Sequence, residues 1–337
     1  MTTLTQTRVA MKHGAGGRSM RKLIERVFLS GATGVAADMD DGAAIPVGDQ
    51  WLIVTTDSHV IQPIVFPGGD IGRLSVAGTV NDLAMMGATE PLGLTCGVVI
   101  EEGFAIEDLE RLQASIRAAC DEAGTTIVAG DTKVMRRGEV DGVVINTSGV
   151  AFARRVIRDR GLRPGDAIVV TGSVGDHGMA VMAVRHEFQF GEPLTSDVAP
   201  LNGLIRAALA AAGDGITAMK DPTRGGVASA LHEMADKSGV SIVVREEAVP
   251  VRATVRAAAE LLGIDPLFIA NEGKALIGVQ PDRLDAVLDA LHQHPRGRDA
   301  AVIGTCLAET PGTIMLDTGF GRRLLSEPDG ELLPRIC

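Results

Sequence analysis

The sequence predicts an α/β or α+β fold in two domains, followed by a flexible tail. Three observations support this prediction. The chain has 337 residues, more than a single hydrophobic core usually supports. Strand-like and helix-like segments alternate along both halves, and a turn sequence, LRPGD at 162–166, separates them. We expect an N-terminal domain over 1–155, a C-terminal domain over 156–320 and a tail over 321–337.

In the first half, the apolar run WLIVT at 51–55 is typical of a buried strand. An apolar stretch at helical spacing, 71–86, is interrupted by two glycines and indicates a helix packed closely against a sheet. The clearest helix is 106–123, because its apolar residues fall on one face and Gly124 stands at the C-cap. Further strands are expected at 94–100, 126–129 and 143–147.

In the second half, a strand at 167–171 runs into a Gly-rich loop at 172–178. The same periodicities predict helices at 201–212, 226–237, 255–262 and 283–292, and strands at 241–244, 275–279 and 301–307. The tail contains Pro328, Gly330 and Pro334 and shows no sustained period. We therefore expect a mobile arm, which would reach on the order of 55 Å if fully extended.

Composition argues against several classes of partner. Aromatic residues make up 3% of the chain and Tyr is absent, so platforms for stacking bases are scarce. The net charge is -11, and no Lys/Arg run is long enough for a basic face, so we expect no nucleic-acid partner. No uninterrupted apolar run reaches the length of a membrane span. The four cysteines form no CxxC pair, which fits a reducing cytoplasm rather than a zinc ribbon or a disulfide framework.

Acidic residues recur in Gly-rich, otherwise apolar settings, where an unpaired charge is costly. They are Asp40 and Asp41, Asp57 after its predicted strand, Asn81-Asp82 within GTVNDLAMMGA, and Asp131 within GDTK at 130–133. Carboxylates at strand ends can converge at one sheet edge, where they repel unless a cation lies between them. Because Mg²⁺ takes oxygen ligands and shares them with phosphates, we interpret the set as a Mg-ATP site. Taken singly, each Asp would more often be a cap or an Asx turn.

Other motifs offer groups for phosphate binding and proton transfer. Lys133 would share a face with Asp131 on an extended segment and could neutralise phosphate charge, although a solvated lysine is a fair alternative. HGAGG at 13–17 could bring backbone N–H groups to a phosphate, or be a simple flexible loop. Asp221 opens DPTRGG ahead of a predicted helix, and Glu272 in NEGK is a candidate general base.

Cys337 is the last residue of the chain and ends a Pro-containing arm. Free cysteines are usually buried, and the other three lie in apolar strand-like or helical context, which core packing explains. The terminal cysteine lacks that explanation, unless it is an accidental last residue.

Together these motifs resemble the HypE family of hydrogenase maturation factors, a member of the superfamily of aminoimidazole ribonucleotide synthetase and selenophosphate synthetase. The matching segments are HGAGG (13–17), DDGAAIP (40–46), TTDSHV (55–60), FPGGDIGRLSVAGTVNDLAMMGA (66–88), EEGF (101–104), GDTKV (130–134), DPTRGG (221–226), NEGK (271–274) and PRIC (334–337). They span nearly the whole chain. GTVNDLAM alone indicates the superfamily, whereas FPGGDIG with a terminal PRIC is specific to the family.

The resemblance implies an aminoimidazole-ribonucleotide-synthetase-like fold whose N-terminal domains pair into a barrel-like homodimer core, with ATP and Mg²⁺ in an N-terminal cleft near the dimer interface. In this family the carbamoyltransferase HypF loads a carbamoyl group onto the terminal cysteine. The enzyme then uses ATP to dehydrate that group to S-cyanocysteine. The cyanide passes to a complex of HypC and HypD and ends on the iron of nickel–iron hydrogenase.

Carried over residue by residue, the resemblance implies that Asp57, Asp82 and Asp131 hold the metal. Lys133 and Glu272 would handle protons and charge, and Cys337 would carry the substrate. The expected nucleotide site is completed by His13, Gly14, Gly16, Gly17, Asp40, Asp41, Asn81, Gly130 and Asp221.

Two alternatives stay open at the level of the sequence. The chain could be a carbamoyl or cyano carrier that binds ATP only structurally, or a small-molecule synthetase of the same superfamily. Selenophosphate synthetase carries a reactive Cys or Sec in its N-terminal segment, and here no cysteine precedes Cys96. The purine enzyme would not need a terminal PRIC.

Overall fold

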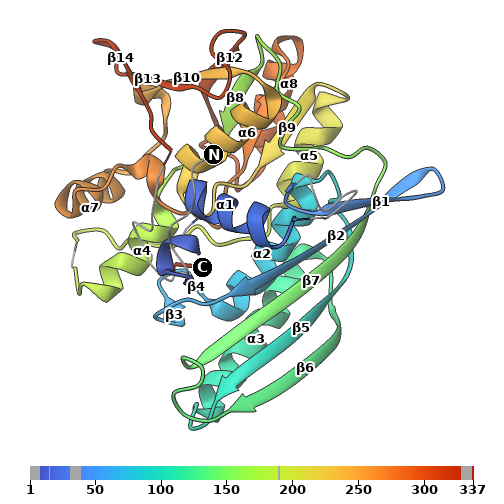
Figure 1. Cartoon of the computed structure of the whole chain (residues 1–337), viewed down its shortest axis with the longest axis vertical. Coiled ribbons are helices and arrows are strands. Elements are labelled where there is room, and N and C mark those ends of the chain that lie inside the picture. Colours follow the sequence, from blue (N-terminus) through green and yellow to red (C-terminus); the bar gives the residue numbers. More distant parts are fainter. Residues whose placement is uncertain (1–7, 15, 31–38, 189, 328–335) are drawn as a thin grey trace.

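The computed structural model describes residues 8–14, 16–30, 39–188, 190–327 and 336–337, and places two open sheets in the chain (Figure 1). The N-terminal sheet has the strand order β1-β2-β7-β5-β6. Its strands are β1 (Ala43–Val47), β2 (Gln50–His59), β5 (Pro91–Glu101), β6 (Ile127–Met135) and β7 (Val143–Ala153). All neighbouring pairs are antiparallel except β5 and β6, which are parallel and are connected by helix α3 (Ile106–Ala123).

Helix α2 (Ile71–Met85) is buried on nearly every side, and apolar or small residues make up most of its sequence. A Cβ at Gly72 would lie 2.6 Å from the Leu112 carbonyl oxygen of α3, so the glycine permits a close helix contact. Leu74 packs in a cluster with residues of the second half, and Met85 joins a second such cluster. Helix α2 therefore links the two halves through shared hydrophobic cores.

The C-terminal sheet has the order β14-β13-β10-β12-β8-β11-β9 and is covered by helices on both faces. Helices α5 and α8 pack on one face with β11, and α6 packs on the other with β10. The strands are β8 (Ala167–Val170), β9 (Ile216–Lys220), β10 (Ser241–Arg245), β11 (Leu276–Val279), β12 (Ala301–Leu307), β13 (Ile314–Asp317) and β14 (Arg322–Leu324). The helices are α4 (Asp176–Arg185), α5 (Asn202–Ala212), α6 (Gly226–Ser238), α7 (Ala253–Leu262) and α8 (Leu284–Gln293).

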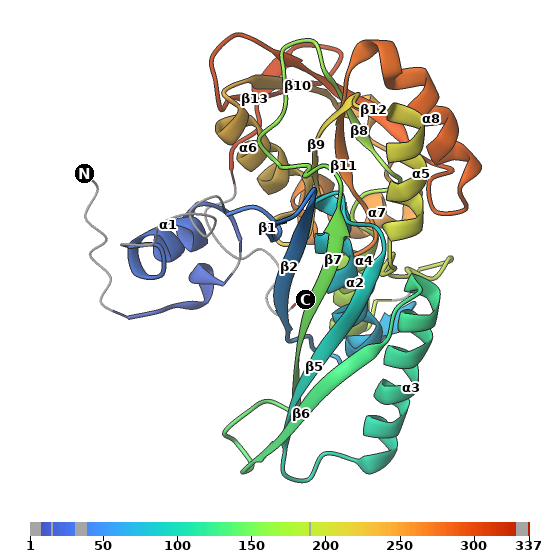
Figure 2. The same cartoon turned by 90° about the vertical axis from the view of Figure 1, so that its right-hand side faces the viewer.

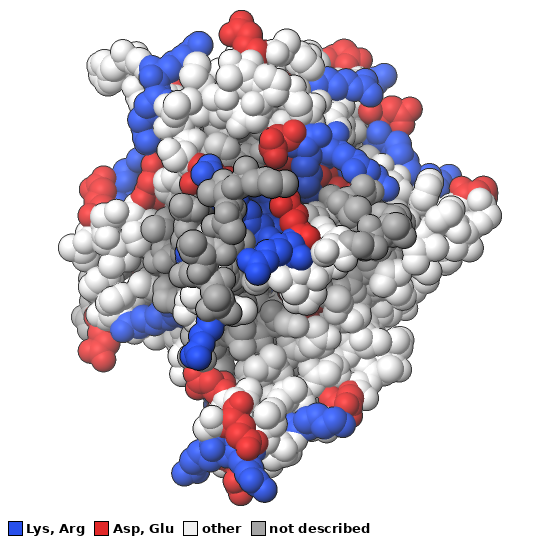
Figure 3. All heavy atoms as spheres, in the orientation of Figure 1, with Lys and Arg blue, Asp and Glu red and all other residues white. Residues whose placement is uncertain are grey.

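Three smaller elements complete the description. Helix α1 (Gly17–Val27) lies beside the boundary between the halves, and β3 (Val65–Phe66) with β4 (Gly69–Asp70) forms a two-stranded ribbon before α2 (Figure 1). None of the helices in the described part of the chain is long and apolar enough to span a membrane. On the face drawn in Figure 3, acidic and basic side chains of the described residues are interspersed.

The predicted strands and helices are found. The Gly-rich loop expected at 172–178 is shorter than predicted, because helix α4 begins at Asp176. Two strands are longer than predicted, with consequences for the site. The strand expected at 51–55 continues to His59, and the strand expected at 126–129 continues to Met135. Asp57 and Asp131 therefore lie within strands, not after them. The expectation of convergence at strand ends was wrong, because both strands continue through their polar segments by pairing with neighbours. The predicted tail begins with β14, and residues 328–335 lie outside the described part.

Among the described residues, α2 and α3 cover one face of the N-terminal sheet (Figure 2), and the other is called the open face here. Alternation along the strands places Asn146 of β7, Gly97 of β5 and Asp131 of β6 in one row on the open face. Strand β6 is an edge strand, and its Val128 and Val134 are 62% and 71% exposed. An apolar edge of this kind is usually covered in a stable protein.

Candidate active site

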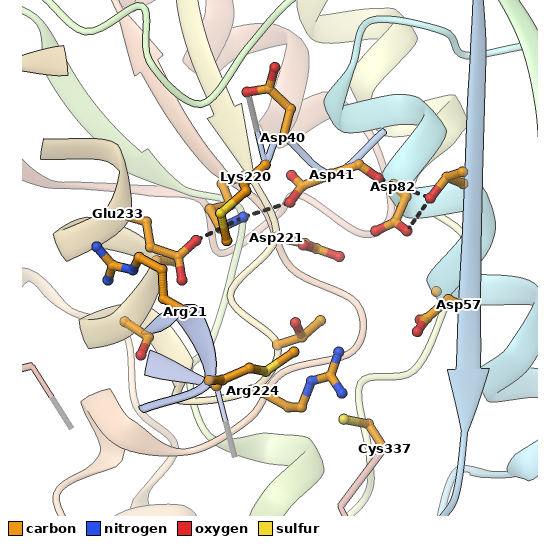
Figure 4. Close-up of a pocket in the computed structure, with 18 of the residues that line it drawn as sticks. Arg21, Asp40, Asp41, Asp57, Asp82, Lys220, Asp221, Arg224, Glu233 and Cys337 are labelled. Carbon is orange, nitrogen blue, oxygen red and sulfur yellow. Dashed lines mark hydrogen bonds and ion pairs between the residues drawn. The ribbon is translucent and has the colours of Figure 1, made fainter. Parts of the chain in front are cut away.

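A cavity of about 280 Å³ lies between the two halves of the chain (Figure 4). Its walls come from α1, β2, α2, the turn between β9 and α6, the Glu272 loop and the end of the chain. Residues that line it include Gly16, Gly17, Asp40, Asp41, Thr55, Asp57, His59, Gly78, Asp82, Lys220, Asp221, Arg224, Glu233, Glu272 and Cys337.

Strand β2 supplies one wall by alternation, since Thr55, Asp57 and His59 share the face that looks toward α2. The Thr55 hydroxyl lies 2.8 Å from Asp82 Oδ2 on α2, which fixes that carboxylate. Gly78 of α2 makes the approach possible, because a Cβ there would lie 2.9 Å from His59 Nε2 and 3.1 Å from Asp57 Oδ2.

The carboxylates of this cavity repel one another. Burial raises the pKa of Asp82 well above its ordinary value, and Asp221, Asp57 and Asp41 add to the rise. Burial, with Asp41 nearby, raises the pKa of Asp221 to about 7. Such shifts mean that the folded chain lacks enough positive charge at this point. An all-oxygen donor set with surplus negative charge fits Mg²⁺.

The protein groups do not form a complete metal site by themselves. Within the described ranges, no three His, Cys, Asp or Glu side chains converge closely enough to hold an ion. Mg²⁺ commonly takes one or two carboxylates and completes its shell with phosphate oxygens and water. The geometry therefore fits a metal that arrives with a nucleotide.

Lys220 fixes the floor of the cavity. Its Nζ lies 2.6 Å from Asp41 Oδ1 and 3.3 Å from Glu233 Oε2 (Figure 4). Burial alone would lower the pKa of Lys220, but the carboxylates of Asp41 and Glu233 raise it well above its usual value. This lysine of β9 therefore ties the acidic segment before β1 to the C-terminal half.

We expect Asp221→Asn to stabilise the nucleotide-free protein more at pH 8 than at pH 5. The pKa of Asp221 is about 7 in the fold and about 3.9 when unfolded, so the folded chain binds more protons between these values. Its carboxylate therefore lowers stability increasingly as pH rises toward 7, and Asn removes that effect. Calorimetry should show a gain in Tm larger by roughly 3 °C at pH 8. The exposed Asp289→Asn is the control, and equal gains at both pH values would refute the assignment.

Cys337 reaches the same cavity from the end of the chain, beside Arg224 (Figure 4). Glu272 lines the same cavity. Burial raises the pKa of its thiol above the usual value, a rise that Arg224 opposes and the nearby carboxylates strengthen. The carboxyl group of Glu272 lies close enough to contribute to this rise in the thiol pKa. The docked thiol is therefore protonated and a poor nucleophile.

Glu272 is buried, with a carboxyl oxygen, Oε1, that has no partner among the described residues. Burial raises its pKa well above the ordinary value, and Asp221 and Asp197 raise it further. Its backbone is held from both sides: Asn81 Nδ2 donates to its carbonyl oxygen at 3.3 Å, and its N–H donates to Asp197 Oδ1 at 3.1 Å. This carboxyl group is positioned to accept a proton in the cavity.

The structure does not bring every predicted site residue to the cavity. His13 caps a local turn, its Nδ1 accepting the Ala10 N–H at 2.9 Å, and neither it nor Gly14 lines the cavity. Asn81 joins the two halves through Leu201 and Glu272. It thus holds the Glu272 loop in place without lining the cavity.

Gly130, Asp131 and Lys133 lie apart from the cavity as well. Asp131 and Lys133 pair with each other at 3.0 Å, with both side chains 69% exposed. They lie on the open face of the sheet, whereas Asp57 lies on the face toward α2. Within one chain, Asp131 therefore cannot share a metal with Asp57 and Asp82.

Comparison with known proteins agrees with this two-part architecture. Residues 39–153 match the family model of the AIR synthase related protein N-terminal domain, and residues 163–317 match that of its C-terminal domain. The chain is 46% identical, over 98% of its length, to the carbamoyl dehydratase HypE of Rhizobium leguminosarum bv. viciae, of which it covers 95%.

The chain belongs to the HypE family.

Solved structures of the HypE family have the same fold. The crystal structure of a HypE-HypF complex contains a chain 44% identical, with a TM-score of 0.86, covering 91% of this chain and 99% of that one. A HypE structure in complex with ATP is 40% identical, with a TM-score of 0.82, covering 97% of this chain and 100% of that one. The AIR-synthase-related fold expected from the sequence is thus confirmed.

Sequence reasoning missed several residues that line the cavity, among them Arg224, Lys220 and His59. Arg224 stands inside DPTRGG, where only the aspartate was singled out. A Cβ at Gly16 would lie 2.9 Å from the Arg224 carbonyl oxygen, so HGAGG and DPTRGG meet in space. That contact joins segments far apart in the chain, and no local pattern predicts it.

Proposed function

We propose that the chain is an ATP-dependent carbamoyl dehydratase that acts on its own C-terminal Cys337, and that its product supplies the cyanide ligand of the hydrogenase iron. The observation that supports this most directly is the position of Cys337, docked in the acidic cavity beside Glu272 and Arg224. The HypE relatives of known structure include a complex with ATP and a complex with HypF.

The reaction would proceed in two chemical steps. The oxygen of the S-carbamoyl group attacks the γ-phosphorus of ATP and releases ADP. The two N–H protons then leave, and the C–O bond breaks to give S–C≡N and phosphate. Glu272 is the base proposed for the protons, and Arg224 stabilises charge on the transferred phosphoryl group. Mg²⁺, held by Asp57 and Asp82 with the phosphates, would neutralise the same charge.

The raised pKa of the Cys337 thiol implies that loading and dehydration occur with the tail in different positions. Carbamoyl transfer from HypF needs a reactive thiolate, which the cavity disfavours. Loading therefore occurs while the tail is undocked, and dehydration occurs after the tail has docked. A neutral S-carbamoyl group carries no charge into the acidic cavity, so docking of the loaded tail costs little electrostatic energy.

The test of this function is the intact mass of the carbamoylated chain before and after addition of Mg-ATP. We expect the loss of one water with release of one ADP and one phosphate. An unchanged mass would favour the carrier alternative.

We further propose that the product passes to HypC and HypD. The four cysteines are free, and we propose the reducing cytoplasm as the location.

We expect Asp82→Asn to weaken Mg-ATP binding by roughly 10- to 100-fold, because it removes one of two carboxylates proposed to hold the metal. Titration calorimetry measures the effect. Asp108→Asn, on the solvent side of α3, is the matched control. Wild-type affinity in Asp82→Asn would remove Asp82 from the proposed metal site.

We propose a homodimer in which the open sheet faces of two chains meet. This would cover Val128 and would bring Asp131 and Lys133 of each chain toward the partner's cavity. The cavity would then be completed in trans, which restores the set of three aspartates expected from the sequence.

Mixing of two variants, each lacking one of the proposed metal ligands, tests this arrangement at a Mg-ATP concentration too low to saturate either variant. In a dimer of one Asp82→Asn chain and one Asp131→Asn chain, one cavity would contain both native aspartates. After exchange of chains we expect about a quarter of wild-type dehydration activity, because half the dimers are mixed and each has one intact site. If the mixture dehydrated no faster than the unmixed variants, completion of the cavity in trans would be contradicted.

A further inference from the structure

The last two residues of the chain contact the start of α4. Ile336 is only 5% exposed and belongs to the hydrophobic cluster that contains Phe66, Leu74 and Met179. Its carbonyl oxygen lies 2.6 Å from Nε2 of His177, a residue with no exposed surface. The end of the chain is thus inserted into the core and held by a buried polar group.

The hydrogen bonds of His177 define its tautomer. A carbonyl oxygen only accepts, so Nε2 carries the hydrogen and donates to Ile336. Nδ1 lies 2.8 Å from Ser196 Oγ. Ser196 Oγ accepts the Val198 N–H at 3.1 Å, which leaves its own hydroxyl hydrogen for Nδ1. Burial lowers the pKa of His177, which keeps the ring neutral and preserves this pattern.

The acceptor of the His177 hydrogen bond, the Ile336 carbonyl oxygen, lies directly before Cys337 in the chain. The Ile336 carbonyl belongs to the peptide group that leads into Cys337, so a bond to it fixes where the Cys337 side chain begins. His177 itself does not line the cavity. Phe66 packs edge-on against the His177 ring, at 5.3 Å between centroids, and restrains its orientation. The hydrogen bond to Ile336 therefore links the histidine to the cavity through the tail.

We propose that His177, oriented by Ser196, is a positioning residue that latches the C-terminal tail in the docked state and so presents the group on Cys337 to Glu272. The inference rests on the proposed function, in which Cys337 carries the reacting group. Removal of the His177 side chain would favour the undocked tail. It would slow dehydration of a loaded chain, and leave both Mg-ATP affinity and loading by HypF intact.

Labelling of the unloaded thiol tests the latch without ATP or a carbamoyl group. Wild type, His177→Ala, His177→Gln and Ser196→Ala are treated with a maleimide, and Cys337 labelling is followed by mass spectrometry of the C-terminal peptide. We expect labelling roughly fivefold faster in His177→Ala, the effect of one net hydrogen bond. Gln carries an N–H donor of similar reach and should restore most of the protection. Ser196→Ala should fall between them.

Two controls separate docking from loss of the fold. Cys306 is fully buried, so its labelling reports general unfolding. His186→Ala, at the exposed end of the same helix, removes a histidine that stacks on Phe188 and should label like wild type. A His177→Ala chain with protected Cys306 and wild-type labelling at Cys337 would overturn the latch. Equal rates of Cys337 labelling in His177→Gln and His177→Ala would also overturn the latch.

A second measurement links the latch to the reaction. In single turnover with preloaded chain, His177→Ala should dehydrate more slowly than wild type, with unchanged Mg-ATP affinity, because the hydrogen bond to Ile336 also sets where the Cys337 side chain begins. His177→Gln should recover most of the rate. If wild type failed to dehydrate while labelling still responded to His177, the proposed function would fail and the docking contact would stand. Normal dehydration by His177→Ala, despite faster labelling, would contradict the positioning role.

Discussion

Glu272→Gln should slow dehydration by on the order of 10²- to 10⁴-fold while HypF still loads Cys337 normally. Glu272 lies close enough to Cys337 to raise the pKa of its thiol, and it retains a buried carboxyl oxygen without a partner in the described structure. General-base catalysis typically contributes a factor of this size. Gln keeps the shape and removes the proton acceptor, so the loss would report chemistry rather than packing.

The pH profile gives a second, independent signature of the base. The pKa of Glu272 is raised by burial and by Asp221 and Asp197, so the wild-type rate should increase with pH as this carboxyl group ionises. The residual rate of Glu272→Gln should lack that increase. Intact mass in single turnover measures both variants, with the exposed Glu260→Gln as control. A wild-type rate in Glu272→Gln would assign the base elsewhere.

Cys337→Ala should abolish carbamoyl loading and dehydration together, and should leave Mg-ATP binding near wild type. The carboxylates proposed for the metal, Asp57 and Asp82, are held by β2 and α2 and do not depend on the tail. Intact mass after incubation with HypF and a carbamoyl donor measures loading, and calorimetry measures nucleotide affinity.

The matched control for this prediction is Cys120→Ala, which removes a buried thiol from α3, away from the cavity. It should cost some stability and leave loading intact. If Cys337→Ala retained the main ATP-dependent activity, the chain would be a small-molecule synthetase of the same fold. The account of a self-modifying enzyme would then be wrong.

The sequence predicted the fold well wherever the signal was local. Helix α3 was predicted over its full length, because its apolar face is regular and Gly124 adopts the left-handed conformation of a C-cap. Strand β6 was cut short, since GDTK looks like a turn by composition. It is extended because β5 pairs with it in parallel register up to Met135. Pairing of this kind depends on residues distant in the chain.

The site was predicted in part for the same reason. Asp57, Asp82, Asp221, Glu272 and Cys337 line one cavity, as expected of a common site. Asp131 does not, because the alternation of β6 points it to the open face, and only the sheet register reveals which face that is. Arg224 and His177 were missed since each acts through a contact with a distant segment.

The most direct test of the central claim follows the oxygen atom of the carbamoyl group. The chain is loaded on Cys337 with an isotopically labelled carbamoyl oxygen and incubated with Mg-ATP, and the released phosphate is examined by mass spectrometry. Phosphorylation of that oxygen in the cavity predicts that the label appears in inorganic phosphate as the nitrile forms. Nitrile formation with unlabelled phosphate would contradict it.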